Sequence, residues 1–396
     1  MSTFWSAVAM PPLFFAGAMP RRREVQPAKA DKLREQMRSQ IQFGNEGQVP
    51  PRREKGRGMW TCRTPFVLAA LLILFPLSGH ARDASGTLDL LITPNNGMPA
   101  MVTPGGAFDA VLREKGELRM LRDGKALPLT AEWTDLPGGR FRAHCTVPAG
   151  AVVGAWSLEC AAGGKTDATV RAVFVFAEFP EYYIIAHLSD VHIGFDGVPA
   201  EETFRKTVSA VNDSDAAFAV ITGDLTHGGT PDQFRKLLEV MDTCMVPTFV
   251  TTGNHDRDGQ VYENFFGPLT YRFTLGRDGY LAFDTKDFMV ADSLGVQDGL
   301  LCEYRRELKP CRWVIGLAHR YEPMMGMRAQ LTLFVDDPLD LLLFGHIHRE
   351  LNPDKGEVMP WGTTPMVAVP AERDGKYRLI DITAQGPRPR PVSEVK

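Results

Sequence analysis

The chain has 396 residues, 44% of them hydrophobic, which is enough for more than one domain with a sizeable core. Its net charge of −4 is divided unevenly, because residues 1–81 carry 12 Lys and Arg against 5 Asp and Glu, which leaves −11 for residues 82–396. Residues 82–396 are so acidic that no basic stripe is available to replace the counterions of a nucleic-acid backbone. We therefore expect no nucleic-acid partner.

The first 81 residues look like processing signals rather than a folded domain. Residues 1–58 contain an Arg triplet, several prolines and little apolar periodicity, so we expect disorder or an over-called extension. Residues 59–81 have a charged start, an apolar run from Phe66 to Leu77 and small residues before a cut after Ala81, the layout of a signal peptide. That run is shorter than the ~20 residues of a membrane-spanning helix. A buried core helix is the alternative, but the pattern favours a periplasmic or secreted protein with no stable membrane span after cleavage.

Residues 82–179 contain short runs of alternating or β-branched residues, such as Phe108–Val111, Phe141–Val147 and Thr169–Phe176. Turns rich in Gly, Pro, Asn and Asp separate these runs. The spacing predicts an antiparallel β-sandwich, and we interpret it as a small all-β immunoglobulin-like domain. No cluster of possible metal ligands falls in it, so we expect an accessory role.

The cysteines leave two interpretations open. Cys145 and Cys160 lie on neighbouring predicted strands, whereas Cys302 and Cys311 flank a short polar segment. Each pair would form a disulfide in an oxidising compartment, and reduced buried thiols are the equal alternative. None of these residues, nor Cys244, falls in a motif with polar ligands.

Residues 180–385 combine helices with β-rich runs, as an α/β domain requires. Thr230, Pro231 and Gln233 are typical of a helix start, and residues 201–211 show a second apolar stripe at helical spacing. Five short apolar runs read as buried strands: Tyr183 to Leu188, Ala217 to Thr222, Pro247 to Thr252, Trp313 to Ala318, and Leu339 to Phe344. Residues 386–396 are basic and rich in proline, so we expect a disordered tail.

A polar motif follows each of the five runs. The motifs are Asp190-Val191-His192, Gly223-Asp224, Gly253-Asn254-His255-Asp256, His319, and Gly345-His346-Ile347-His348. Open α/β sheets build their active sites at the carboxyl ends of strands. Imidazoles, carboxylates and an amide are donors that suit Mn, Fe, Zn or Mg, and five of the nine histidines fall in these motifs. The pattern therefore predicts a metal site.

The number of ligands indicates two metal ions. The candidates are Asp190, His192, Asp224, Asn254, His319, His346 and His348. One ion takes three or four protein ligands, whereas seven suit two ions roughly 3.5–4 Å apart that share a carboxylate. Asp224 is the expected bridge, because no imidazole accompanies it in its motif. His255 remains as a proton donor, with Asp256 beside it to orient the ring.

Other polar residues near the motifs have plainer interpretations. We expect His187 to pack within its strand, and His227 stays open between solvation and substrate contact. Arg320 and Arg349 each follow a candidate ligand, where a guanidinium can clamp a phosphate with two hydrogen bonds. Arginines are also common on surfaces, so the ordinary interpretation stands beside this one.

The five motifs, in this order, resemble those of the calcineurin-like metallophosphoesterases over residues 181–383. The resemblance implies a four-layer α/β/β/α sandwich and hydrolysis of phosphate esters. It assigns one metal to Asp190, His192 and His348, the other to Asn254, His319 and His346, and the bridge to Asp224. The segment 223–229 looks most like the branch of class III cyclic-nucleotide and glycerophosphodiester phosphodiesterases. His227 and Arg320 depart from that branch, which leaves the substrate open.

We therefore expect an exported phosphoesterase with two divalent metal ions, which cleaves a phosphodiester or phosphomonoester. A hydroxide shared by the ions would attack phosphorus. One alternative is an exported non-catalytic binding protein with a residual metal site, which the complete ligand set disfavours. Another is a pyrophosphate hydrolase that acts on a lipid-linked substrate. The sequence contains no amphipathic membrane helix that would support this alternative.

Overall fold

The computed structural model describes residues 86–284, 293–320, 327–351 and 363–395. The expected extension and signal segment of residues 1–81 lie outside the described residues, so those expectations stay predictions. No helix within the described ranges is long and apolar enough to cross a membrane.

The segment before residue 176 is built of strands. One sheet has the order β1 (Leu91–Thr93), β3 (Ala107–Leu112), β7 (Arg140–Thr146) and β6 (Thr130–Leu136). The other has the order β2 (Ala100–Val102), β9 (Lys165–Val175), β8 (Gly154–Ala162), β4 (Glu117–Arg122) and β5 (Lys125–Pro128). Side chains such as Leu112, Leu158 and Val173 are fully buried in one apolar cluster. Alternation along each strand explains this, because every second residue faces the same side of a sheet.

The cysteines of this segment are free thiols. Cys145 on β7 and Cys160 on β8 are both buried and unbridged, as are Cys244 and Cys302 elsewhere in the described chain. Burial raises the pKa of Cys145 to about 12 and that of Cys160 to about 11. Of the two interpretations that the sequence left open, the structure shows the reduced one.

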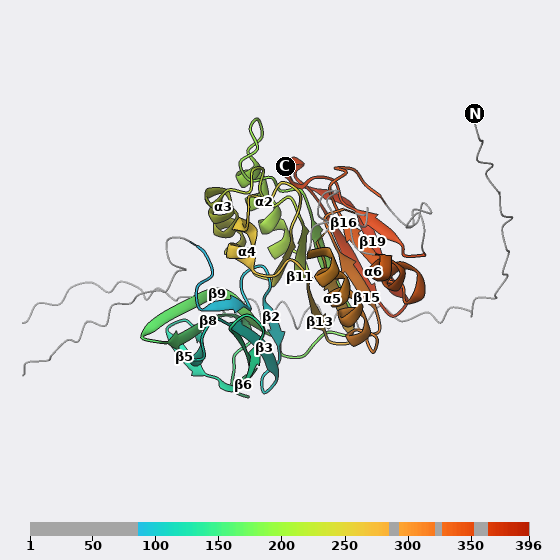
Figure 1. The fold of residues 1–396 in the computed structure, drawn as a ribbon. Coiled ribbons are helices and arrows are strands. Elements are labelled where there is room, and N and C mark those ends of the chain that lie inside the picture. Colours follow the sequence, from blue (N-terminus) through green and yellow to red (C-terminus); the bar gives the residue numbers. More distant parts are fainter. Residues whose placement is uncertain (1–85, 285–292, 321–326, 352–362, 396) are drawn as a thin grey trace, which may run out of the picture. The chain divides into compact units, whose positions relative to one another are not determined.

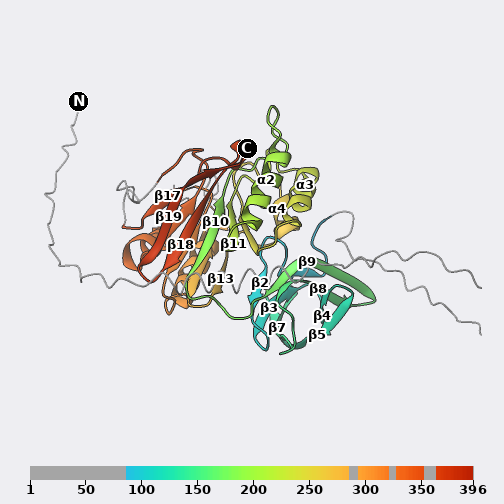
Figure 2. The ribbon, with the colours of Figure 1, turned by 180° about the vertical axis from the view of Figure 1, so that it is seen from behind.

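The five apolar runs form strands in two further sheets. The first has the order β12 (Thr248–Thr251), β11 (Ala216–Thr222), β10 (Tyr183–Leu188), β18 (Lys376–Thr383) and β19 (Gly386–Glu394). The second has the order β13 (Tyr271–Leu275), β14 (Asp278–Ala282), β15 (Val314–Leu317), β16 (Leu341–Phe344) and β17 (Met366–Ala368). Strands β10, β11 and β12 are parallel, and so are β14 to β17, whereas β18 runs antiparallel to β10 (Figure 2).

Helices cover the outer faces of both sheets (Figure 1). On the first sheet lie α2 (Ala200–Asn212), α3 (Pro231–Met241) and α4 (Val261–Phe266), and on the second lie α5 (Ser293–Glu307), α6 (Met327–Leu331) and η1 (Thr332–Asp336). The predicted start of α3 is confirmed, because the Thr230 side chain accepts a hydrogen bond from the Gln233 N–H. The Gln233 side chain does not reach back to Thr230; it accepts from the Gly228 N–H.

The two sheets pack face to face around an aromatic core. The rings of Phe218 on β11 and Tyr280 on β14 lie 5.1 Å apart, edge to face, and both are fully buried. A second apolar cluster, which includes Phe283 and Leu342, lies between the second sheet and its helices. The expected mixed α/β class is confirmed, and the layers follow the order helix, sheet, sheet, helix.

Strand β19 spans Gly386–Glu394, so the prediction of a disordered tail is wrong for these residues. Strand β19 pairs antiparallel with β18, with Pro389 opposite Ile380 and Pro387 opposite Ile382. Proline cannot donate to a ladder, but it is tolerated on an edge strand. β19 is the edge of its sheet. The prediction of disorder rested on the many prolines of this segment. An edge strand can carry such prolines, whereas a central strand cannot.

Candidate metal centre

Carboxyl ends of strands from both sheets meet at one edge, and the polar motifs follow them. Strands β10, β11 and β12 lead into the motifs of Asp190, Asp224 and Asn254. Strands β15 and β16 lead into His319 and the Gly-His-Ile-His motif. Because neighbouring parallel strands end at the same edge, segments far apart in the sequence supply one site.

Backbone hydrogen bonds hold the loops after β10 and β11 side by side. The N–H of Asp190 donates to the carbonyl oxygen of Gly223 at 3.0 Å, and that of His192 donates to Asp224 at 2.9 Å. Gly253 allows the third loop to approach, since a Cβ atom there would lie 2.1 Å from the backbone nitrogen of Asp224. The glycine of this motif therefore serves close packing of the backbone.

Most of the candidate ligands have a left-handed backbone. Their φ values lie between 49° and 64° for Asp190, His192, Asp224, His346 and His348. This region is sparsely populated by residues other than glycine, although Asp and His enter it more readily than most. Such strain concentrates at functional sites, where the surrounding structure enforces it.

The first group of ligand atoms belongs to Asp190, His192 and His348, which all lie within 4.8 Å of one another. Nε2 of His348 lies 3.1 Å from Oδ1 of Asp190. Both ring nitrogens of His192 are buried, and neither has a hydrogen-bond partner among the described residues. A buried imidazole without partners is costly, so its nitrogen atoms are suited to a ligand.

The second group comprises Asp224, His319 and His346, again within 4.8 Å. Nδ1–H of His319 donates to the carbonyl oxygen of Thr222 at 2.8 Å, which leaves Nε2 as the ligating nitrogen. That Nε2 atom lies 3.1 Å from Oδ2 of Asp224. The same Asp224 oxygen is 3.6 Å from Nε2 of His192, so one carboxylate reaches both groups, as a bridge must.

Asn254 is the seventh candidate, and its side chain also lacks a partner. The Oδ1 atom is buried and accepts no hydrogen bond from the described residues. A buried amide oxygen ordinarily has a donor. A hard cation would satisfy it.

Burial and charge set the protonation states of these groups. Burial lowers the pKa of His192 to about 4 and also lowers that of His346. Burial alone would raise the pKa of Asp224, but the charge of His319 and their hydrogen bond hold it well below its usual range. Neutral imidazoles and ionised carboxylates are the forms that bind metals. The buried polar atoms without partners and this donor set together fit two divalent ions.

His255 lies beside the two groups. Its backbone N–H donates to Oδ1 of Asp224 at 2.9 Å, and its ring stands edge-on to that of His192 with centroids 4.7 Å apart. Nδ1–H of the ring donates to the carbonyl oxygen of His227 at 2.8 Å. The His227 and His255 rings are stacked, with centroids 4.9 Å apart. His227 thus lies at the site and orients His255 through its carbonyl group.

Asp256 does not orient His255, and that part of the prediction is corrected. Its buried carboxylate accepts hydrogen bonds from the backbone N–H groups of Leu225, Thr226 and Gly253. Its oxygens are therefore occupied in fastening the loop after β11 to the loop after β12. Asp256 acts on the ring only through the shape of these loops.

Three residues from the sequence analysis remain to be placed: His187, Arg320 and Arg349. His187 is fully buried and its Nε2 atom lies 3.0 Å from Oγ1 of Thr222, which confirms the packing interpretation. The side chain of Arg349 is exposed. The phosphate-clamp roles of Arg320 and Arg349 stay predictions.

Arg373 is a residue of the site that no motif indicated. It lies in a one-turn 3₁₀ helix, η3 (Glu372–Asp374), after the last motif. Its Nη2 atom is 3.2 Å from Nδ1 of His348, and its guanidinium carbon lies 4.3 Å from the centre of the Phe195 ring. Neither residue type nor spacing marks it in the sequence, because only the fold brings residue 373 to residue 348.

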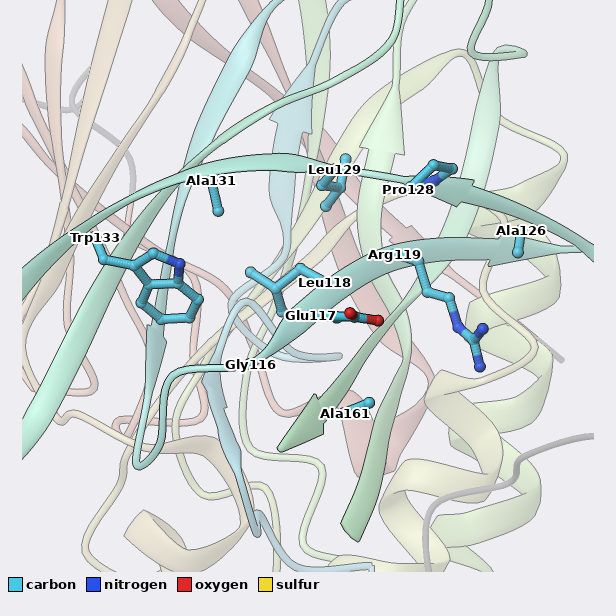
Figure 3. Close-up of a pocket in the computed structure, with 10 residues that line it drawn as sticks. All are labelled: Gly116, Glu117, Leu118, Arg119, Ala126, Pro128, Leu129, Ala131, Trp133 and Ala161. Atoms are coloured by element: carbon cyan, nitrogen blue, oxygen red, sulfur yellow. The ribbon is translucent and has the colours of Figure 1, made fainter. Parts of the chain in front are cut away.

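A surface pocket lies elsewhere, on the β-rich segment before residue 176 (Figure 3). Its volume is about 640 Å³, and its lining includes Leu118, Leu129 and Trp133. None of the predicted site residues lines it. The chemistry is therefore located by the convergence of strand ends rather than by the size of a pocket.

Comparisons with known proteins find a family model, relatives and a solved structure that are similar to parts of this chain. Residues 183–350 match the model of the family described as calcineurin-like phosphoesterase. A probable cyclic nucleotide phosphodiesterase of Vesicomyosocius okutanii is 22% identical over 42% of this chain and 79% of that protein. Another, from Rhodopseudomonas palustris, is 24% identical over 39% of this chain and 66% of that protein. A purple acid phosphatase structure from yellow lupin aligns with 74% of this chain and 69% of its own, at 12% identity and a TM-score of 0.43.

The strand-end site with its imidazole and carboxylate donors defines a metal-dependent hydrolase of phosphoric esters. The match to the calcineurin-like phosphoesterase family covers the segment 183–350, which holds the motifs at the strand ends.

Proposed function

We propose that the chain hydrolyses a phosphodiester or a phosphomonoester at a centre of two divalent metal ions. One observation carries the proposal: two groups of ligand atoms lie within reach of a single buried carboxylate, that of Asp224. Mn, Fe, Zn and Mg suit the donor set. When bound, two such ions acidify a water molecule and screen the charge of the phosphate.

The residues of the chain supply proton transfer. Since Nδ1–H of His255 is bound to a carbonyl group, Nε2 is the atom left to exchange a proton with the departing oxygen. It donates only while the ring is an imidazolium. The stacked His227 and the edge of His192 restrict the His255 ring to this orientation.

The substrate class is proposed from the relatives. Two of them bear the name of probable cyclic nucleotide phosphodiesterases, so cyclic nucleotides are the first diesters to test. A binding protein with a residual site is the weaker candidate, because all seven ligand positions keep their donors.

We further propose that the protein is exported and that the all-β segment before residue 176 is an immunoglobulin-like accessory domain. The export proposal rests on the pattern of residues 59–81. The accessory role is supported by the absence of predicted ligands between residues 86 and 179.

A substrate screen tests the proposed function. Purified protein supplied with Mn would be assayed with cyclic nucleotides, glycerophosphodiesters and nitrophenyl phosphates. We expect turnover of at least one class that an Asp224→Asn variant loses. Equal residual turnover by the variant would assign the activity to a contaminant and contradict the proposal.

A further inference from the structure

We propose that Arg373 is an anion-recognition residue of this site, and that it favours a dianionic phosphate monoester over a singly charged diester. The inference rests on the proposed function and narrows its substrate class. Arg373 lies outside the segment 183–350 that matches the family model.

The fold fixes the backbone of Arg373 to the loop that carries Asp190. The N–H of Glu372 donates to the carbonyl oxygen of Ser189 at 2.8 Å, and that of Arg373 donates to Asp190 at 3.3 Å. Gly375 ends the turn with a left-handed φ of 75°. Two backbone hydrogen bonds therefore attach Arg373 and its neighbour to the loop that carries Asp190.

Phe195 then holds the side chain. The guanidinium carbon of Arg373 lies 4.3 Å from the centre of the Phe195 ring, within the range of a cation–π contact. The Phe195 ring also contacts the ring of His227 edge to face, with the two centroids 4.9 Å apart. Among the described residues, no carboxylate lies within ion-pair distance of Arg373. Its charge is thus positioned at the site without a partner of opposite sign.

The hydrogen bond of Arg373 also depends on the state of His348. A guanidinium has only donors, so Nδ1 of His348 accepts here and its proton resides on Nε2, which faces Asp190. If Nε2 of His348 held a metal ion, Nδ1 would carry the proton and could not accept from Arg373. Arg373 then needs another acceptor, and a phosphate oxygen is the acceptor that the reaction brings.

The count of phosphate oxygens gives the selectivity. A diester has two non-bridging oxygens and one negative charge, which the two cations of the centre can satisfy. A monoester has a third non-bridging oxygen and a second charge. A guanidinium beside the cations stabilises this additional charge and has little to offer the diester.

The test compares two substrates that share a leaving group. Wild-type protein and Arg373→Gln and Arg373→Lys variants, all supplied with Mn, would be assayed with p-nitrophenyl phosphate and bis(p-nitrophenyl) phosphate. We expect Arg373→Gln to lower kcat/KM for the monoester by roughly 10- to 100-fold and for the diester by less than about 3-fold. Arg373→Lys should recover part of the monoester activity, since it restores the charge without the planar donors.

Calorimetry with inorganic phosphate gives a readout apart from turnover. The Arg373→Gln variant should bind phosphate roughly 10-fold more weakly at pH 8 and keep the wild-type metal content. Arg205→Gln is the matched control, because Arg205 lies on α2 and pairs with Glu201. It should change neither measurement.

Equal losses on both substrates, no loss on either, or a loss of metal in Arg373→Gln would overturn the inference. Wild-type protein that cleaves neither substrate nor any diester of the wider screen would instead overturn the proposed function. The phosphate titration would then still decide whether Arg373 binds the anion.

Discussion

Nε2 of His319 lies 3.1 Å from Oδ2 of Asp224, and neither side chain is more than 2% exposed. Burial alone would lower the pKa of His319, but the carboxylate raises it to about 9. Two charged groups so far from water need each other, or a cation in place of the proton. The stability of this buried pair therefore depends on whether a metal ion is bound beside it.

The first prediction concerns that content. Protein purified under metal-replete conditions should contain close to two transition-metal ions per chain, and Asp224→Asn should lose most of both, because Asp224 reaches both ligand groups. Elemental analysis measures this directly. One ion or none in the wild-type protein would refute a dinuclear centre.

The second prediction separates proton transfer from metal binding. His255→Ala should keep its metals, because among the described residues the His255 ring hydrogen-bonds to a carbonyl group alone. It should lose roughly 10²–10⁴-fold in turnover. The loss should be smaller for nitrophenyl esters than for alkyl esters, since a good leaving group needs no proton. His144→Ala, an exposed histidine on β7, is the control and should behave as wild type. Equal impairment on both ester types would contradict the role of proton donor.

The third prediction concerns pH and stability. Burial raises the pKa of Glu372 to about 8 from an ordinary value near 4.5. The pKa of Glu372 is higher in the folded state than in the unfolded state. The contribution of this carboxyl group to folding stability is therefore fully present below pH 4.5 and is lost as pH rises toward 8. Glu372→Gln should therefore match wild type at pH 4 and be more stable by roughly 1–3 kcal/mol at pH 8.

Thermal or urea unfolding at pH 4, 6 and 8, with chelator present so that metals do not contribute, measures the difference. Glu202→Gln, at a position on the exposed face of α2, is the control and should not reproduce it. A constant difference at all three pH values would show that the substitution acts by packing rather than by charge.

The fourth prediction concerns processing. We expect translation to begin near Met59 and the mature chain to begin at Arg82 or within a few residues of it. N-terminal sequencing of protein from the extracytoplasmic fraction tests this. An intact chain that begins at Met1, or a cytoplasmic protein that retains Phe66 to Leu77, would show that the apolar run is a structural segment.

The sequence predicted the strands, and it predicted which polar donors come together at their ends, because both follow local rules. Buried parallel strands read as short apolar runs, and each run ends in a motif whose donors have little other reason to recur in that order. The predicted run of Tyr183 to Leu188 has the same bounds as β10. Helix α3 was predictable for the same reason, since its start is written in Thr230 and Pro231.

What the sequence did not predict depends on contacts between distant segments. Asp256 is adjacent to His255 in the chain, yet its carboxylate turns toward the loop after β11, where three backbone N–H groups hold it. Arg373 reaches His348 only because β18 pairs with β10 and brings η3 to the loop of Asp190. Neither relationship leaves a trace in spacing or composition.

The left-handed backbone of five candidate ligands has a consequence for how such a chain diverges. At Asp190, His192, Asp224, His346 and His348, a substitution must satisfy the turn as well as the metal, and most side chains would add about 1–3 kcal/mol of backbone strain. Asn254 and His319 carry no such constraint. A descendant that abandoned catalysis would be expected to change Asn254 and His319 first, and to keep aspartate, histidine or glycine at the other five positions long after the metals were gone.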